Sequence, residues 1–550
     1  MVPPFYLIMR KIILNILALF VPLAISAYKD PASGVVYEIN GDGTAKVASN
    51  NFGRNLSRSN IDILSSFTEN GKTYTVTEIS ENAFGASEYG LVGGGEYYIT
   101  SVSIPETVTT IGSCAFAYCY NLTSVNLPSN LSKLGVSAFY KCESLSSAIE
   151  IPASLSTIER GTFNFCKNLT SIKISEGVKV IGGNAFSNTG VTKMYIPNSV
   201  EKLEGAVFYG CENLQEVTLP NNLNIIEAAL FQNSGLLKVN LPNSIKEIRQ
   251  YAFYGCKNLT SIQMPENLTT IGNFVFWGCK NLTELFIPKG VESIGRWIVC
   301  GCDNLKTLTV ENGNQKYDSR DNCNGIIETA NNTLIVGCPG TQIPSNVEYL
   351  GEYAFSRCTG LKEIIIPGNV KSIGENAFEK CDNLLSVKID EGVNQIGGLS
   401  FDACQNLETL ILPNSITEIG YGAFGYCKLK SVTSYIKEPF DLKKGTFVTT
   451  WTSDTTYTNG VASIKTCITS YDVDATLYVP IGTKEQYQNT EGWKLFKEIV
   501  EKELTGIRSV YADFNSEAIY DLRGQRTTRH SKGINIIRKY DGSVTKVIRK

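Results

Sequence analysis

The sequence predicts a solenoid, a row of similar coils stacked on one another that each contribute a strand to a parallel β-sheet. Three observations predict it. A phenylalanine recurs about every 23 residues, apolar residues hold a fixed frame around it, and proline and glycine fall at constant offsets from it. At 550 residues the chain is too long for one globular core, whereas stacked coils need to contact only their neighbours.

The phenylalanine marks one position in each coil. Its steps are 22 to 24 residues, and it forms two runs separated by an insertion: Phe116, Phe139, Phe163, Phe186, Phe208, Phe231, Phe253 and Phe276, then Phe355, Phe378, Phe401 and Phe424. Phe84 begins the series, Val299 replaces the phenylalanine once, and Phe447 is the last member. We therefore expect about 13 to 14 coils with a repeated aromatic interior.

One coil, residues 121–142, shows how the frame places its side chains. Val125 and Leu127 alternate as the inward residues of a short strand, and Pro128 ends that strand because proline cannot donate to a sheet. Two leucines return to the interior on the path back, and Gly135 is expected to permit a tight bend. The residue between the two inward strand positions should point to solvent.

The repeated unit resembles the leucine-rich repeat of the BspA-like bacterial surface proteins. Its pattern is L-x-x-I-x-I-P-x-x-V-x-x-I-G-x-x-A-F-x-x-C, and residues 372–381 nearly match that consensus. The insertion near 311–345 is similar too, because it predicts a hairpin with Asn331 and Asn332 at its turn. The resemblance implies a leucine-rich-repeat solenoid over residues 76–450, with a parallel β-sheet on its concave face.

The N-terminus predicts a signal peptide at residues 1–27. Arg10 and Lys11 precede an apolar run of about 14 residues, and Ala27 is a small residue at the expected cleavage edge. A membrane-spanning helix needs about 20 apolar residues, so we expect no transmembrane span after cleavage.

Both ends of the solenoid are expected to carry caps, because terminal coils must hide their exposed core edge. Residues 28–75 predict a β-rich N-terminal cap with a Gly-Asp-Gly turn at 41–43. Residues 451–503 predict a C-terminal cap with a strand at 475–480 and a short helix at 492–497.

The tail, residues 504–550, breaks the period and is predicted to be a small β-rich module. Residues 507–550 hold ten Lys and Arg against four Asp and Glu, although the whole chain carries a net charge of −3. The segments AIYDLRGQR (518–526) and KGINIIR (532–538) resemble the C-terminal sorting domain of type IX secretion. That resemblance implies export to the outside or the outer surface of a Gram-negative bacterium. An unrelated basic β tail that binds anionic polysaccharide is the alternative.

The sequence predicts that the chain is not an enzyme. Its one histidine, His530, lies in the basic tail, where an imidazole has no fixed cleft in which to serve a catalytic triad. We see no nucleotide-binding loop, no cluster of metal ligands and no cofactor motif, so no catalytic residue, metal or cofactor is assigned. The slight negative charge argues against nucleic acid as a partner.

Most cysteines follow the period. Eleven lie three residues after the repeat position: Cys119, Cys142, Cys166, Cys211, Cys256, Cys279, Cys302, Cys358, Cys381, Cys404 and Cys427. We expect them to be small buried side chains in a ladder of reduced thiols. Five others leave the period and are better candidates for disulfides, as expected in an exported protein: Cys114, Cys300, Cys323, Cys338 and Cys467.

The outward strand positions are the predicted binding surface. Most are polar, but four carry apolar side chains: Tyr195, Phe286, Ile365 and Ile411. Exposed apolar residues on a regular sheet suggest contact points. The predicted ligand-binding residues are Tyr195, Gln263, Phe286, Thr309, Ile365 and Ile411, with Phe286, Gln263 and Thr309 as one surface.

The sequence therefore predicts a secreted or cell-surface protein that binds a protein or a surface glycan, in the manner of an adhesin. The alternative is a structural scaffold component of the bacterial surface without a host ligand. An exposed aromatic stripe on the sheet would favour binding, whereas a uniformly polar sheet that self-associates would favour the scaffold.

Overall fold

The computed structural model describes residues 27–49, 59–85, 99–443, 445–448, 450–458, 461–470 and 473–504, and four strands between residues 518 and 549. The predicted signal peptide lies outside these residues except for Ala27. The chain divides into two compact units, Met1–Asp318 (unit 1) and Ser319–Lys550 (unit 2), and each is described by itself. In the described part of the chain, no helix combines the length and the apolar character needed to cross a membrane.

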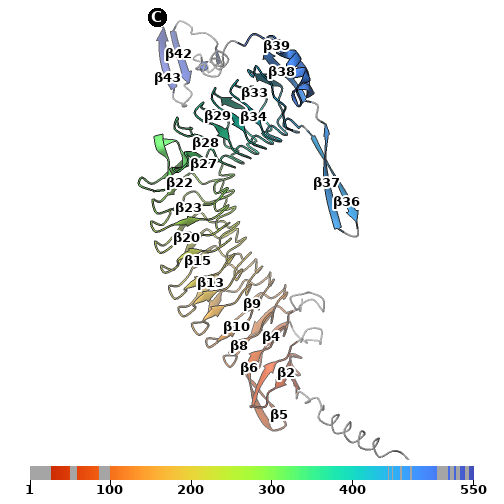
Figure 1. Ribbon diagram of the computed structural model, residues 1–550. Helices are drawn as coiled ribbons and strands as arrows, with labels where there is room; N and C mark the ends of the chain where they lie inside the picture. Colours follow the sequence, from red (N-terminus) through yellow and green to blue (C-terminus); the bar gives the residue numbers. More distant parts are fainter. Residues whose placement is uncertain are drawn as a thin grey trace, which may run out of the picture. The chain divides into compact units, whose positions relative to one another are not determined.

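Most coils of unit 1 contribute two short strands, which stack in parallel into two ladders (Figure 1). Ladder A contains β4 (Asn60–Asp62), β7 (Ser101–Ser103), β9 (Ser124–Val125), β11 (Ile149–Ile151), β13 (Ile172–Ile174), β15 (Lys193–Tyr195), β17 (Glu216–Thr218), β19 (Lys238–Asn240), β22 (Glu284–Ile287) and β24 (Thr307–Val310). Ladder B contains β6 (Lys72–Ile79), β8 (Thr110–Ile111), β10 (Lys133–Leu134), β12 (Thr157–Ile158), β14 (Val180–Ile181), β16 (Lys202–Leu203), β18 (Ile225–Ile226), β20 (Glu247–Ile248), β21 (Thr270–Ile271) and β23 (Ser293–Ile294). The short strand β25 (Tyr317–Asp318) ends the unit.

Unit 2 repeats this plan. Its ladder A contains β29 (Glu363–Ile366), β31 (Ser386–Ile389), β33 (Thr409–Leu412), β35 (Ser431–Ser434), β38 (Val473–Pro480) and β39 (Phe496–Lys502). Its ladder B contains β27 (Thr333–Gly337), β28 (Tyr349–Leu350), β30 (Ser372–Ile373), β32 (Gln395–Ile396) and β34 (Glu418–Ile419). The solenoid has about 16 turns, more than the expected 13 to 14, because β3 (Thr44–Val47) and β38, which lie outside the Phe-marked coils, also pair in parallel with the ladders.

The insertion forms the predicted hairpin. After a short 3-10 helix, η1 (Arg320–Asn322), strand β26 (Gly325–Glu328) pairs antiparallel with β27. Asn332 takes a left-handed backbone conformation at the turn, and the Thr333 backbone N–H donates to Asn331 Oδ1 at 3.1 Å. Strand β27 then pairs in parallel with β28, so the hairpin leads directly into ladder B.

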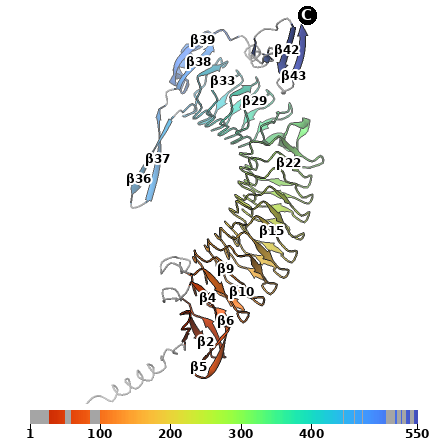
Figure 2. The same ribbon diagram turned by 180° about the vertical axis from the view of Figure 1, so that it is seen from behind.

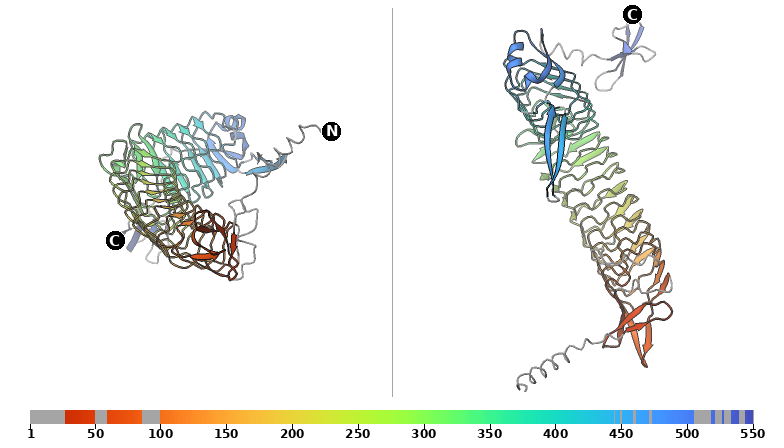
Figure 3. Two further views of the ribbon diagram at one scale, coloured as in Figure 1. Left: turned by 90° about the horizontal axis from the view of Figure 1, so that it is seen from below. Right: turned by 90° about the vertical axis from the view of Figure 1, so that its right-hand side faces the viewer.

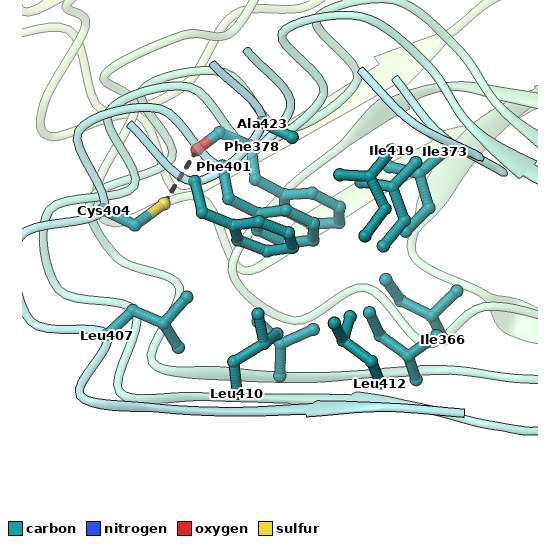
Figure 4. Close-up of a cluster of buried hydrophobic side chains, with 14 of the residues drawn as sticks. Ile366, Ile373, Phe378, Phe401, Cys404, Leu407, Leu410, Leu412, Ile419 and Ala423 are labelled. Atoms are coloured by element: carbon teal, nitrogen blue, oxygen red, sulfur yellow. Dashed lines mark hydrogen bonds between the residues drawn. The ribbon is translucent and has the colours of Figure 1, made fainter. Parts of the chain in front are cut away.

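The repeated phenylalanines form one stack of rings inside each unit. Neighbouring centroids from Phe84 to Phe276 lie 5.1 to 6.0 Å apart. Those from Phe355 to Phe447 lie 4.8 to 5.4 Å apart. Figure 4 shows Phe378 and Phe401 face to face, with Ile373 and Ile419 of ladder B beside the rings and Ile366, Leu410 and Leu412 of ladder A below them. A 23-residue coil thus buries its apolar side only against its neighbours.

The glycine after ladder B has a different role from the one expected. Gly135 does not take a positive φ, so it is not needed for an unusual bend. A Cβ on Gly135 would lie 2.3 Å from the Ser113 backbone nitrogen of the preceding coil, and Gly397 makes a similar approach to Gly374 at 2.7 Å. Glycine is therefore required here because two coils touch backbone to backbone.

The N-terminal segment closes the first coils with a small meander. Strands β1 (Ala27–Lys29), β2 (Val36–Ile39) and β3 (Thr44–Val47) run antiparallel, with the expected turn between β2 and β3. Strand β3 joins β6 in parallel, and β5 (Ser66–Glu69) pairs with β6 antiparallel. Tyr37 is fully buried against Phe67, and its hydroxyl accepts a hydrogen bond from the Leu64 N–H at 3.1 Å.

The C-terminal segment covers the end of the phenylalanine stack. Strand β38 contains the strand predicted at 475–480. The short helix predicted at 492–497 is wrong, because that stretch holds only a 3-10 turn, η2 (Trp493–Leu495). The α-helix of this segment, α2, lies earlier, at Lys484–Asn489. Trp493 is fully buried 6.0 Å from Phe447, and its indole N–H donates to the Phe440 carbonyl at 3.0 Å. Burial of Trp493 next to Phe447 holds residues 493–495 in a 3-10 turn at the place where a helix was expected.

Two further sheets occur in unit 2. Strands β36 (Thr450–Thr458) and β37 (Val461–Ser470) form an antiparallel hairpin, which Figures 2 and 3 draw as two long paired strands. The tail contributes β40 (Ala518–Tyr520), β41 (Arg526–Thr527), β42 (Gly533–Arg538) and β43 (Val544–Arg549), an antiparallel sheet of order β41-β40-β42-β43. The expected β-rich module is therefore present.

The cysteine ladder is buried as predicted, and its thiols are hydrogen-bond donors. Cys279 Sγ donates to the carbonyl of Phe253 one coil earlier at 3.1 Å, and Cys404 does the same to Phe378 at 3.2 Å (Figure 4). Where the period shortens, Thr189 occupies the cysteine position and lies 3.4 Å from Cys211 Sγ. The cysteine therefore satisfies a buried carbonyl as well as filling space.

The disulfide prediction for the cysteines outside the period is wrong where it can be checked. Cys323 and Cys338 are thiols that donate to the carbonyls of Gly325 and Asn324, at 3.6 and 3.3 Å. Cys114 and Cys300 are buried thiols as well. These residues serve local turns and the interior, while the side chain of Cys467 lies outside the described residues.

Candidate functional site

The outward face of ladder A in unit 1 brings the predicted surface residues into rows. Parallel pairing places Tyr195 beside Thr218 and Thr218 beside Asn240, and a bridge continues the row from Asn240 to Gln263. Because the strands are in register, residues 22 or 23 apart in sequence become neighbours in this row. The row follows the stacking direction of the coils.

The structure confirms the outward position of most predicted site residues and corrects one. Tyr195, Phe286 and Ile365 are exposed, at 56%, 51% and 38% of their surface. Phe286 on β22 pairs with the half-buried Thr309 on β24, and Gln263 is exposed. Gln263 belongs to the row of Tyr195, the coil of Phe286 follows directly on that of Gln263, and Ile365 lies in unit 2.

Ile411 is buried, contrary to its prediction as an exposed contact residue. Only 8% of its surface is accessible. Its outward side chain packs with Tyr435, and Leu504 covers the pair. Leu504 is the residue that precedes the tail, so a segment outside the repeat hides this part of the sheet.

A groove lies on the row between Tyr195 and Gln263. It has a volume of about 560 Å³ and is lined by strands β17 and β19 and the loops that follow them, among them Thr218, Asn221, Asn240, Asn243 and Ser244. Thr218 and Asn240 form its floor, and the asparagines and the serine come from the loops. The lining offers hydroxyl and amide groups, which can both donate and accept hydrogen bonds.

The loop wall of the groove is held by hydrogen bonds between coils. Asn221 N–H donates to Asn198 Oδ1 at 3.1 Å, and Ser244 Oγ donates to the Asn221 carbonyl at 2.8 Å. Asn267 Nδ2 then donates to the Asn243 carbonyl at 2.8 Å. Such a wall is organised before a ligand arrives, which lowers the entropy cost of binding.

Sequence reasoning missed this wall because it considered only strand positions. The signal was present, since Asn follows the strand-ending proline or its neighbour in several successive coils: Asn198, Asn221, Asn243 and Asn267. Asparagine recurring in loops is typical of side chains that bond to nearby backbone.

The charges beside the groove largely compensate one another. Lys193 and Glu216 lie on paired strands with 3.5 Å between Nζ and the carboxylate, and Lys238 is the next residue of that row. Exposed ion pairs of this kind contribute roughly 0 to 1 kcal/mol. Shape and hydrogen-bonding groups therefore characterise this groove more than net charge does, although Glu216 and Lys238 are part of its lining.

The buried thiols are poor nucleophiles. Burial raises the pKa of the Cys211 thiol to about 11 and that of Cys256 to about 12. A thiol reacts as its thiolate, so these groups stay inert near neutral pH. Among the described residues, no group of three or more His, Cys, Asp or Glu side chains is arranged to hold a metal ion, and His530 lies outside those residues.

Comparison with known proteins identifies the family. The model of the BspA type leucine-rich repeat region, which contains six copies of the repeat, matches residues 95–215, 201–324 and 338–448. The chain belongs to the BspA-type leucine-rich-repeat family. The match covers all coils of the cysteine ladder and every coil of the phenylalanine stack after that of Phe84. No curated protein sequence matches the chain.

Several solved structures resemble this BspA-type chain. A leucine-rich repeat protein from Bacteroides ovatus is 27% identical, with 74% of this chain and 94% of that chain covered and a TM-score of 0.49. A leucine rich cell surface protein from Faecalibacterium prausnitzii is 22% identical, with 88% and 97% covered and a TM-score of 0.34. The pneumococcal vaccine antigen PcpA is 17% identical, with 87% and 99% covered and a TM-score of 0.35.

Proposed function

We propose that this chain is a secreted or cell-surface binding protein, not an enzyme, whose ligand occupies the groove between Tyr195 and Gln263. The ligand is a protein segment or a surface glycan. The observation that carries the proposal is the coincidence of the 560 Å³ groove with the row in which Tyr195 is 56% exposed. An aromatic side chain at the edge of a polar groove supplies apolar contact, and the amides supply orientation.

Three features support a location outside the cell. The chain belongs to the BspA-type family, whose resemblance implies surface proteins. Its first 27 residues carry the pattern of a signal peptide. The tail differs from the solenoid in charge and strand arrangement, as expected for a segment that directs export or attachment.

Binding to a panel of matrix proteins, mucins and bacterial surface polysaccharides tests the proposal. For any ligand found, Tyr195→Ala combined with Asn240→Ala should lower the affinity at least tenfold, because both the aromatic contact and a floor amide are lost. The matched control is Tyr421→Ala, which removes a tyrosine that is 40% exposed in unit 2. Equal affinity of the double variant and the wild type for every ligand found would place the binding site elsewhere.

A further inference from the structure

A second surface of unit 1 is built from aromatic rings and does not belong to ladder A. Tyr251, Phe274 and Trp297 occupy the same turn position in three successive coils, two residues before the repeat position. Tyr254 and Trp277 occupy the position just after it in two of these coils. All five side chains are partly exposed. We call these five residues the aromatic surface.

The five rings touch one another across the coils. Phe274 stacks 4.9 Å from Tyr251 and 4.7 Å from Trp297, with interplanar angles of 9° and 10°. Tyr254 stacks 6.0 Å from Trp277 at 11°. The two columns meet where Phe274 lies 5.5 Å from Trp277. The surface is therefore continuous over three coils.

The backbone makes this choice of residues unusual. Tyr251, Phe274 and Trp297 have φ values of 61°, 59° and 57°, in the left-handed region. Most other coils place a smaller residue at this position, such as Asn184, Asn376, Ser137 or Ala206, so the left-handed turn does not itself require a ring. The left-handed conformation costs about 1–2 kcal/mol per residue, whereas a ring pair contributes about 0.5–1.5 kcal/mol beyond its burial. Stacking alone therefore gives little reason to retain three aromatic residues here.

The arrangement of the rings indicates what they could bind. Both faces of Phe274 are covered by neighbouring rings, so the column presents ring edges, which carry the positive part of the aromatic quadrupole. Three exposed cations flank the rings in sequence: Lys257, Lys280 and Arg296. A sugar cannot stack on the faces of Phe274, which are both covered, while carboxylates complement both the ring edges and the cations.

We propose that the aromatic surface is a docking site for a protein partner that presents an acidic segment with aromatic side chains. Tryptophan, tyrosine and arginine are the residues that most often dominate the binding energy of protein interfaces. The site is separate from the groove beside Tyr195, so it adds a second partner to the protein and does not depend on the groove having a ligand.

A random copolymer of glutamate and tyrosine is the probe, with the full chain in solution. The test variant is Tyr251→Asn/Phe274→Asn/Trp297→Asn, which removes one column and installs the residue that other coils carry at this turn. The control is Tyr353→Asn, at the same turn position in unit 2 with φ of 59°. Circular dichroism and thermal unfolding check the fold, and the single variant Trp297→Asn replaces the triple variant if that one is unstable.

The wild type and Tyr353→Asn should bind the copolymer with equal affinity. The triple variant should bind it at least tenfold more weakly than the wild type. If Trp297→Asn is used instead, it should bind at least threefold more weakly. No binding by the wild type, or equal binding by a folded variant, overturns the proposal. Wild-type binding to polygalacturonate that matches the copolymer and is lost in the same variant also overturns it, because an acidic polysaccharide would then be the ligand. Binding to the groove ligand should be unchanged in all these variants, which separates this site from the proposed function.

Discussion

Phe286 in unit 1 and Ile411 in unit 2 occupy the same outward strand position, yet their surroundings are opposite. Phe286 is 51% exposed, while Ile411 is 8% exposed beneath Tyr435 and Leu504. The coils around them share the phenylalanine stack and the cysteine ladder. The difference therefore comes from Tyr435 and from Leu504, which lies outside the repeat, and not from the shared phenylalanine and cysteine frame.

This comparison separates two properties that a period alone does not distinguish. The period determines whether a side chain points inward or outward, because successive strand residues alternate between faces. Whether an outward side chain meets water depends on what passes over the sheet. In unit 1 the row from Tyr195 to Gln263 is exposed, and in unit 2 Leu504 packs on the outward side chains of Ile411 and Tyr435.

The largest expected effect contrasts an inward with an outward phenylalanine in unit 1. Phe231 lies between Phe208 and Phe253 in the stack and is fully buried. Phe231→Ala should lower the free energy of unfolding by about 3–5 kcal/mol, the usual cost of emptying such a site. Phe286→Ala should change it by less than about 0.5 kcal/mol. Urea unfolding followed by circular dichroism measures both. Similar losses of unfolding free energy in the two variants would show that outward residues of the sheet stabilise the fold as much as the buried stack does.

The next effect tests the cover over unit 2. Ile411→Ala should cost about 2 kcal/mol of unfolding free energy, because it empties a covered apolar site. Ile365→Ala, at the equivalent but 38% exposed position, should cost less than about 0.5 kcal/mol. Leu504→Ala should make Ile411→Ala less costly, since the site is then already open to water. Independent effects of Leu504 and Ile411 in a double-mutant cycle would contradict the contact.

A smaller effect concerns pH and the thiol ladder. Burial raises the pKa of Cys256 from 9.0 to about 12, so the folded state keeps a proton that the unfolded state releases. The stability from this thiol is present below about pH 9 and is lost as pH rises toward 12. Each pH unit in that window removes about 1.4 kcal/mol per thiol. Cys256→Ala should therefore flatten the alkaline loss of stability by that slope, measured by urea unfolding from pH 8 to 10.5. Parallel curves for the two proteins would contradict a buried, protonated thiol.

Much of the fold could be predicted because each coil repeats the same physical problem. Phe139 and Cys142 recur at fixed offsets, so their burial could be inferred from many copies at once. The role of Gly135 could not, since the approach to Ser113 depends on how closely two coils stack. The thiol hydrogen bonds also escaped prediction, because the carbonyl that accepts from Cys142 belongs to Phe116 in another coil.

The site was less predictable than the fold. Tyr195 and Gln263 could be placed on the outward face from alternation alone. The groove between them also needs Asn221 and Ser244, which lie in loops whose course the period does not describe. The burial of Ile411 depends on a residue 93 positions later in the sequence, and contacts of that range leave no periodic signal.

The smallest expected change in stability comes from the tail, which begins just after the residue that covers Ile411. Deletion of residues 507–550 keeps Leu504, β38 and β39, so the covered face and the cap around Trp493 remain intact. The thermal midpoint of the solenoid should stay within about 2 °C of the wild-type value, which corresponds to a change in unfolding free energy of less than about 1 kcal/mol.

We predict that the tail acts in export or surface attachment, so the protein without residues 507–550 should fold and bind but accumulate in the cell envelope. Immunoblots of envelope and culture medium measure this, with a chain carrying Arg526→Gln, Arg529→Gln and Lys532→Gln as the control for charge alone. Full export of the truncated protein would contradict a sorting role, and retention caused by the charge substitutions alone would indicate that basic charge, and not the tail's fold, determines location.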